Sequence, residues 1–270
     1  MNIKTAPLWQ WILLLIASLV LGFLGYGLVL GFEEVFHSWI ASFAASLALI
    51  GLYVLVVRWF EKEWAPDILA KRGLADLLLG LAIGVLFFCV VVGVMRLTGV
   101  CTLERLSFDW DAQLSAFMMF FGVAVGEEIL FRGVLFKWID KRWGPWWALL
   151  VSGLVFGLVH VTNDNATWWS GIAIAIEAGL LLGAAYKWSG TLWLPIGIHW
   201  AWNYTQGNIF DFAVSGNDAG STWLKVLTDG PDILTGGAFG AEASIISVLL
   251  GAALAAVLVW GYIKKKNQFK

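Results

Sequence analysis

Charged residues are scarce in this chain. They make up 13% of its 270 residues, whereas hydrophobic residues make up 60%. Soluble domains carry about 25% charged residues, so the composition excludes an ordinary soluble protein. The formal net charge is only −2, which argues against nucleic acid as a partner because such binding needs concentrated positive charge. Two cysteines, Cys89 and Cys101, are too few for a disulfide framework or a cysteine metal cluster. We predict an integral membrane protein.

Two motifs that identify common hydrolases are also absent. The chain has no HExxH, which excludes a zincin-type helix, and no GxSxG elbow of the serine hydrolases. No internal repeat is evident, and Pro195 is the only proline inside a clear apolar stretch. Transporters built from repeated halves with broken helices usually show both features, so their absence disfavours that class.

Apolar stretches long enough to cross a bilayer are abundant. At roughly 20 residues per span, we place eight of them at 8–31, 38–58, 77–99, 113–137, 145–162, 168–187, 191–210 and 243–263. The predicted fold is all-α, a polytopic membrane helix bundle of about eight transmembrane helices. Residues 61–76 are interpreted as a short interfacial helix, and residues 211–242 as an extramembrane loop.

The distribution of basic residues predicts the orientation. If the N-terminus is cytoplasmic, 13 of the 17 basic residues fall on the cytoplasmic side: Lys4, Arg58, Lys62, Lys71, Arg72, Lys137, Lys141, Arg142, Lys187, Lys264, Lys265, Lys266 and Lys270. Short loops rich in Lys and Arg remain in the cytoplasm. Both termini are therefore predicted to be cytoplasmic.

A few polar residues, whose transfer into a membrane costs free energy, remain inside the predicted spans. They are Glu127, Glu128, Arg132, His160, Glu177, His199 and Asn203. Ionisable groups at membrane depth are rare and are candidates for a functional site. Glu177 stands alone in its span, so we interpret it as a protonated, hydrogen-bonded residue, whereas His37 lies in an outer loop beside acids and is set aside.

Helix geometry separates the polar residues of the stretch EEILFRG (127–133). Glu128 and Arg132 are four residues apart and share a face, which predicts a structural ion pair. Glu127 points about 100° away from Glu128 and is the carboxylate expected in a cavity. There it can accept a proton from water.

Two further constellations carry imidazole and amide groups. His160 ends the stretch VFGLVH, and His199 and Asn203 lie four apart in IGIHWAWN. An imidazole beside an amide can donate hydrogen bonds to an oxyanion. The same side chains could supply a metal site, although amide ligation is unusual for zinc.

Three motifs thus follow one another on successive predicted spans: EExxxR at 127–132, FxxxH at 156–160 and HxxxN at 199–203. Their order resembles that of the CAAX-protease and bacteriocin-processing family (CPBP, or Abi). Its members include type II CAAX prenyl endopeptidases and proteins similar to lysostaphin-resistance protein A. The resemblance covers roughly residues 112–208.

This resemblance implies an intramembrane endopeptidase that cleaves a membrane-anchored or prenylated (CAAX-type) protein or peptide. Glu127 and His160 would activate water, and His199 and Asn203 would stabilise the oxyanion. The family is commonly called a metalloprotease, so zinc held by Glu127, His160 and His199 and a metal-free glutamate mechanism both stay open. The chain would divide into N-terminal helices with an interfacial segment (1–111), a catalytic core (112–208), an extramembrane loop (209–242) and a last helix with a basic tail (243–270).

Two other classes of function fit the composition. One is a non-proteolytic membrane scaffold or bacteriocin-immunity protein of the same architecture, and the other is a proton-coupled transporter. The expected partners are the lipid bilayer and a peptide or lipidated protein, and the expected location is a prokaryotic plasma membrane. Helix rises put Glu127 and His199 roughly 12 to 15 Å from the cytoplasmic ends of their helices. The site is thus expected to open toward the cytoplasmic half, and His160 can join it only on a tilted helix.

Overall fold

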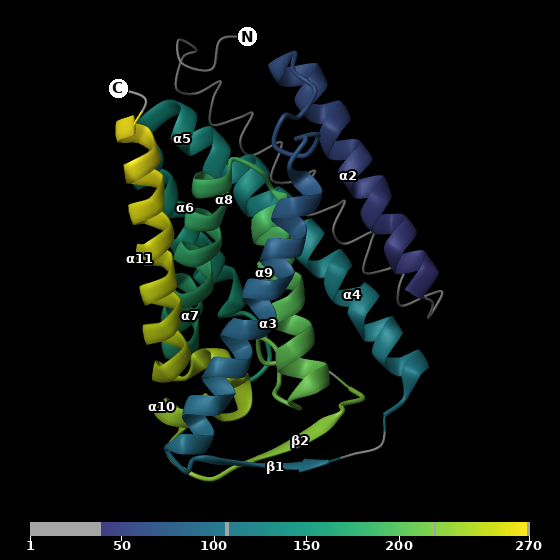
Figure 1. Cartoon of the computed structure of the whole chain (residues 1–270), viewed down its shortest axis with the longest axis vertical. Coiled ribbons are helices and arrows are strands. Elements are labelled where there is room, and N and C mark those ends of the chain that lie inside the picture. The colour runs from purple at the N-terminus through teal and green to yellow at the C-terminus, as the bar shows by residue number, and fades with distance from the viewer. Residues whose placement is uncertain (1–38, 106–107, 219, 269–270) are drawn as a thin grey trace.

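Helices dominate the part of the chain that the structure describes. This computed structural model describes residues 39–105, 108–218 and 220–268. The predicted span at 8–31, His37 and the N-terminus lie outside the described residues. Figure 1 shows the helices side by side in one bundle, with a short two-stranded ribbon across one end.

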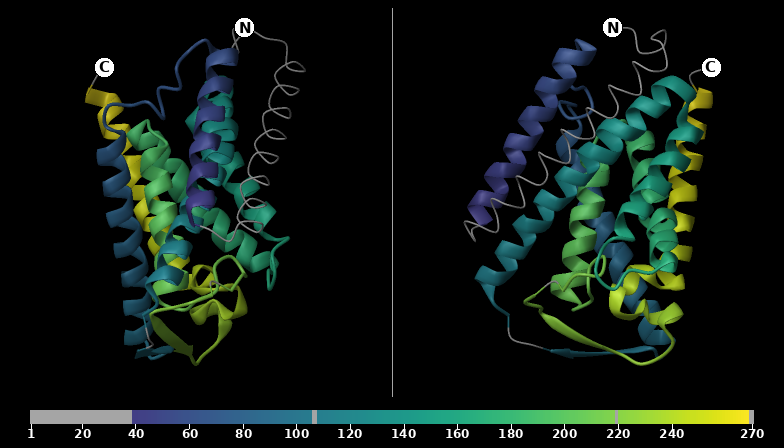
Figure 2. Two further views of the ribbon diagram at one scale, coloured as in Figure 1. Left: turned by 90° about the vertical axis from the view of Figure 1, so that its right-hand side faces the viewer. Right: turned by 180° about the vertical axis from the view of Figure 1, so that it is seen from behind.

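Five helices in the described ranges are long and apolar enough to cross a membrane. The helices α2 (Trp39–Glu61), α3 (Gly73–Leu97) and α11 (Ile245–Gln268) are three of them. The fourth joins α4 (Trp110–Glu128), the π-helical η1 (Ile129–Phe136) and α5 (Lys137–Trp143), and the fifth joins α7 (Trp168–Ile174), the π-helical η2 (Ala175–Leu180) and α8 (Leu181–Ser189). The fourth helix runs obliquely across the bundle (Figure 2).

Two further predicted spans correspond to shorter helices. Residues 145–162 form α6 (Pro145–His160), an apolar helix of 16 residues. Residues 191–210 form α9 (Trp193–Tyr204), which continues into the π-helical η3 (Thr205–Ile209). The described residues therefore support a helical membrane bundle, while the expected count of eight spans is not confirmed.

The region predicted as an extramembrane loop is folded. Strand β2 (Leu224–Thr228) pairs antiparallel with β1 (Cys101–Arg105), with Cys101 opposite Thr228. The short helices α10 (Asp232–Thr235), η4 (Gly237–Phe239) and η5 (Ala241–Ala243) then lead into α11. The ribbon was not predicted, because five-residue strands are too short for a clear alternation of polar and apolar residues.

The bundle has two distinct ends. We call the ribbon β1–β2 with residues 161–167 and 210–244 the hairpin end. There Asn163 donates a hydrogen bond to the Ser215 carbonyl at 2.9 Å, and Asp229 N–H donates to the Val100 carbonyl at 2.9 Å. The opposite end gathers the last turns of α2, α5, α8 and α11 with residues 62–72, and we call it the basic end (Figure 1). Lys187 pairs there with Asp140 at 2.6 Å.

Residues 62–72 form turns rather than the predicted interfacial helix. The residue at their centre, Asp67, is buried and accepts hydrogen bonds from the hydroxyls of Tyr53 (2.7 Å) and Tyr186 (3.1 Å). It also lies 3.3 Å from the ammonium of Lys137. A buried carboxylate with three partners fixes this segment over the helix ends.

Glycines allow two pairs of helices to approach closely near the site. A Cβ on Gly197 of α9 would lie 2.5 Å from the Leu77 carbonyl and 3.0 Å from Gly80 Cα on α3. A Cβ on Gly179 of η2 would lie 2.8 Å from Gly153 Cα on α6. Small residues at such crossings let membrane helices pack backbone to backbone. The contacts fix α9 and α6, the two helices that carry the candidate histidines.

Candidate active site

The two glutamates of EEILFRG face different surroundings, as the helical spacing predicted. Glu128 and Arg132 are 0% exposed, and their side chains pair at 2.8 Å. The Glu127 side chain is 16% exposed and points into a cavity of about 560 Å³. One helix therefore presents a paired carboxylate to the interior and a second carboxylate to the cavity.

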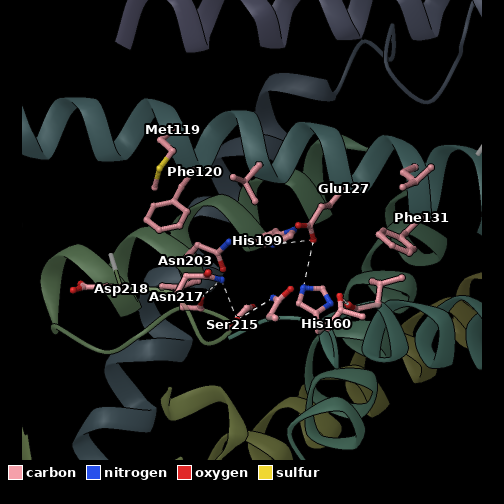
Figure 3. A pocket seen from close by; sticks show the side chains of 16 residues that line it. Met119, Phe120, Glu127, Phe131, His160, His199, Asn203, Ser215, Asn217 and Asp218 are labelled. Carbon is pink, nitrogen blue, oxygen red and sulfur yellow. Dashed lines mark hydrogen bonds and ion pairs between the residues drawn. The ribbon is translucent and has the colours of Figure 1, made fainter. Parts of the chain in front are cut away.

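Glu127 lies between the two histidines. Its Oε2 atom is 3.9 Å from His160 Nε2 at the end of α6 and 3.9 Å from His199 Nε2 on α9. Figure 3 shows these three side chains turned toward one another from three different helices. Two atoms 3.9 Å apart can both reach a single bridging water at hydrogen-bond distance. The two separations are thus those that a water molecule bridging the carboxylate and either imidazole requires.

The other ring nitrogen fixes the tautomer of His160. Its Nδ1 lies 2.7 Å from the Phe156 carbonyl oxygen, one turn earlier on α6. A carbonyl oxygen only accepts, so Nδ1 must carry the hydrogen and donate it. In the neutral ring, Nε2 then presents its lone pair toward Glu127. His160 is set up to accept a proton from water.

His199 has a different second partner. Its Nδ1 lies 2.9 Å from Glu128 Oε1, the carboxylate oxygen that Arg132 also contacts. Since Glu127 stands before Nε2, one carboxylate faces each nitrogen of the ring. In the doubly protonated ring both nitrogens are donors, so Nε2 can donate a hydrogen bond. The sequence spacing predicted the Glu128–Arg132 pair but gave no sign that Glu128 also orients His199.

The guanidinium of Arg132 is buried and has both polar and aromatic neighbours. It donates to the carbonyls of Gly179 at 3.2 Å and Ala178 at 3.4 Å, both in η2, and its Cζ lies 4.5 Å from the centre of the Phe156 ring. A π-helical turn disturbs the regular hydrogen-bond ladder and often marks functional sites. Here η2 offers two of its carbonyls to the cation.

Asn203 completes the group on α9. It lies one turn beyond His199, is buried, and lines the same cavity as Glu127, His160 and His199. Figure 3 shows Asn203 and His199 on the same side of that space. An amide N–H₂ and a protonated Nε2 side by side can both donate to one oxygen. All four residues predicted to be catalytic are brought together.

The possible zinc ligands do not form a compact donor set. Tetrahedral zinc with bonds near 2.05 Å brings its donor atoms within roughly 3.3 Å of one another. Glu127 Oε2 is 3.9 Å from each of the two histidine nitrogens. Across the described ranges, no group of three or more His, Cys, Asp or Glu side chains is arranged to hold a metal ion. These separations suit a bridging water molecule better than a metal ion.

A further buried acid, Glu242, lies next to the site, and the sequence analysis did not identify it. Glu242 of η5 is buried and accepts a hydrogen bond from Ser215 N–H. With Glu177 it lines a small cavity of about 20 Å³ that also touches His160, His199 and Asn203, room for about one water. Burial raises the pKa of Glu242 to about 7, although the Ser215 hydrogen bond opposes that rise. The sequence feature that could have indicated the burial of Glu242 is its position among small residues, Gly-Ala-Glu-Ala-Ser, which permit close packing.

The cavity opens toward the hairpin end. Its polar lining comes from residues just beyond α6 and from the loop after η3: Thr162, Asn163, Ser215, Asn217 and Asp218. Thr162, Asn217 and Asp218 are exposed. The expectation of an opening toward the basic end is therefore wrong. His160 is the last residue of α6, and the oblique course of α4 brings Glu127 to meet it at that end (Figure 2).

Comparisons with known proteins agree with the motifs. Residues 109–205 match the family model described as "Type II CAAX prenyl endopeptidase Rce1-like". The matched segment contains Glu127, His160, His199 and Asn203. Among curated proteins, no relative matches the chain significantly. The family match confirms the resemblance to CPBP proteases.

Proposed function

We propose that this chain, a member of the type II CAAX prenyl endopeptidase Rce1-like family over residues 109–205, is an intramembrane endopeptidase. The family is a protease family, and the described helices are those of an integral membrane protein. A prokaryotic plasma membrane is the proposed location. The proposed reaction is hydrolysis of a peptide bond by a water molecule activated without metal.

One observation supports separate roles for the two histidines. His160 Nδ1 faces a neutral carbonyl at 2.7 Å, whereas His199 Nδ1 faces the carboxylate of Glu128 at 2.9 Å. The first environment places the ring hydrogen on Nδ1, so Nε2 of neutral His160 can accept a proton, and the second lets a doubly protonated His199 donate from both nitrogens. Glu127 lies 3.9 Å from both Nε2 atoms. A water molecule can therefore be held between Glu127 and His160, and the substrate carbonyl can lie on the other side of Glu127, beside His199.

The proposed steps follow from these placements. Water between Glu127 and His160 attacks the scissile carbonyl carbon and gives up one proton to this pair. The carbonyl oxygen becomes an oxyanion, which accepts hydrogen bonds from His199 Nε2–H and the Asn203 amide. Collapse of the tetrahedral intermediate breaks the C–N bond, and the proton held by Glu127 or His160 moves to the leaving amine. The products are one carboxylate and one amine.

The test is cleavage by purified protein in lipid. Wild type, Glu127→Gln and Glu104→Gln are incubated with a panel of prenylated and transmembrane peptides, and the products are identified by mass spectrometry. Glu104 is an exposed acid on β1 and serves as the matched control. We expect Glu127→Gln to lose about 10² to 10⁴-fold in rate, the usual contribution of general acid–base catalysis, and Glu104→Gln to match wild type. Equal cleavage by all three proteins would overturn the assignment of Glu127.

A further inference from the structure

The two ends of the bundle differ in charge. The basic end carries Arg58, Lys62, Lys71, Arg72, Lys137, Lys141, Arg142, Lys187, Lys264, Lys265 and Lys266. The hairpin end carries mainly acids: Glu104, Asp109, Asp111, Asp164, Asp211, Asp218, Asp229 and Asp232. Contacts hold the basic end together in space, such as those of Lys141 with Glu61 and of Lys265 with the Trp188 carbonyl. The asymmetry is therefore a property of the folded bundle and not only of the sequence.

This asymmetry orients the protein in the membrane. Short loops and helix ends rich in Lys and Arg stay on the cytoplasmic side, and acids contribute little to the choice. The basic end is then cytoplasmic, and the hairpin end faces the opposite side. The catalytic cavity opens at the hairpin end through Thr162, Asn217 and Asp218.

The route from the basic end is filled. Between the site and that end, η1 is buried along its whole length, from Ile129 to Phe136. Beyond it, Lys137 lies 3.3 Å from both Glu61 and Asp67 in a buried cluster. A cytoplasmic peptide would have to break this polar cluster to reach Glu127. Entry from the hairpin end requires no such disruption.

The charged residues that line the cavity do not suit the terminal carboxylate of a prenylated CAAX tail. Such a tail ends in a free carboxylate three residues after the modified cysteine, roughly 10 Å from the scissile bond in an extended chain. Among the described residues that line the cavity, none is a lysine or arginine, and Asp218 is at its mouth. Arg132 cannot serve because it is fully buried against Glu128. A terminal carboxylate would meet the like charge of Asp218 at the mouth and find no lysine or arginine among these lining residues.

We propose that the enzyme cleaves an internal bond in an uncharged or cationic segment that adjoins a transmembrane helix on the side of the membrane opposite the cytoplasm. The assignment rests on the proposed function. The apolar wall from Met119, Phe120 and Val123 of α4 receives the membrane-embedded part of this substrate. The acidic mouth receives the segment beyond the scissile bond.

Cysteine labelling tests the side of access without any need for activity. Asn217→Cys and Thr162→Cys place a thiol at the mouth, and Lys71→Cys places a matched exposed thiol at the basic end, each in a Cys89→Ala/Cys101→Ser background. A membrane-impermeant maleimide is applied to intact cells and then to permeabilised cells. We expect both mouth variants to react in intact cells and Lys71→Cys to react only after permeabilisation. The reverse pattern would overturn the proposal whether or not any peptide is cleaved.

A matched pair of peptides tests the substrate class in proteoliposomes. Both contain one transmembrane segment and the same scissile bond, but one ends three residues later as a free carboxylate and the other continues as a neutral, amidated extension. We expect kcat/KM for the extended peptide to be at least tenfold higher, and Asp218→Lys to narrow that ratio. An equal or inverted ratio would overturn the substrate assignment. If neither peptide is cleaved faster by wild type than by Glu127→Gln, the proposed function fails and the substrate assignment with it, while the labelling result still decides the side of access.

Discussion

Replacement of Arg132 should lower the free energy of unfolding far more than a typical point substitution does. Arg132 and Glu128 are both 0% exposed and pair at 2.8 Å. In Arg132→Met the carboxylate of Glu128 stays buried beside His199 without its main cation. Removing one partner of a buried ion pair costs about 3 to 5 kcal/mol, which is a large part of the stability of most proteins.

Replacement of Glu128, the other member of the pair, should have a smaller effect on stability. In Glu128→Gln the guanidinium keeps the carbonyls of Gly179 and Ala178 and the face of the Phe156 ring. The new amide oxygen can still accept a hydrogen bond from His199. The loss should be smaller than in Arg132→Met, and the double variant Glu128→Gln/Arg132→Met should be more stable than Arg132→Met alone, because no buried charge is then left unpaired.

The assay is thermal unfolding of the four proteins in one detergent, followed by size-exclusion chromatography, with cleavage measured separately. A midpoint for Arg132→Met equal to that of wild type would refute the reasoning about the buried pair. So would a double variant less stable than Arg132→Met. Full stability with lost cleavage would instead move Arg132 from a structural to a catalytic role.

Three further predictions concern helix packing, pH and metal. Gly197→Ala should cost about 1 to 3 kcal/mol through overpacking, because its Cβ would lie 2.5 Å from the Leu77 carbonyl, whereas Gly93→Ala, with nothing within 4 Å, should leave the thermal midpoint unchanged. Burial raises the pKa of Glu242 from 4.5 to about 7, so between these values the folded state keeps a proton that the unfolded state releases. The free energy of unfolding should therefore fall by roughly 3 kcal/mol as pH rises through this window. In Glu242→Gln the thermal midpoint should decline less between pH 4.5 and 7. A decline equal to that of wild type would contradict the raised pKa of Glu242. Chelators such as phenanthroline should leave cleavage at its untreated rate if Glu127 and the histidines act on water alone, and loss of cleavage that zinc restores would contradict the metal-free mechanism.

Much of the site was predictable because helical spacing acts locally. Glu128 and Arg132 are four residues apart in a continuous helix, so their pairing follows from the helix alone. The same geometry turns Glu127 onto another face, where the structure shows the cavity. The family match over residues 109–205 agrees with motifs that each lie within one helix.

Other features depend on contacts between segments far apart in the chain. The hydrogen bond from His199 to Glu128 joins residues 71 positions apart, and the contact from Ser215 to Glu242 joins two parts of a region predicted to be a loop. No periodicity in either segment encodes these distances. They arise from the packing of α9 against α4 and from the way the loop after η3 folds against η5.

The sequence by itself determined that the protein resides in a membrane, that its charged ends are asymmetric, and that Glu127, His160, His199 and Asn203 form one set. The first two properties follow from composition and charge distribution, where free energies of transfer suffice. The set of four residues, which come from three different helices, was implied by the order of the motifs and the family resemblance. Only the tertiary structure decided which histidine is flanked by a carboxylate and at which end the cavity opens. Both depend on how oblique helices cross and which side chains fill the space between them, which no single segment specifies.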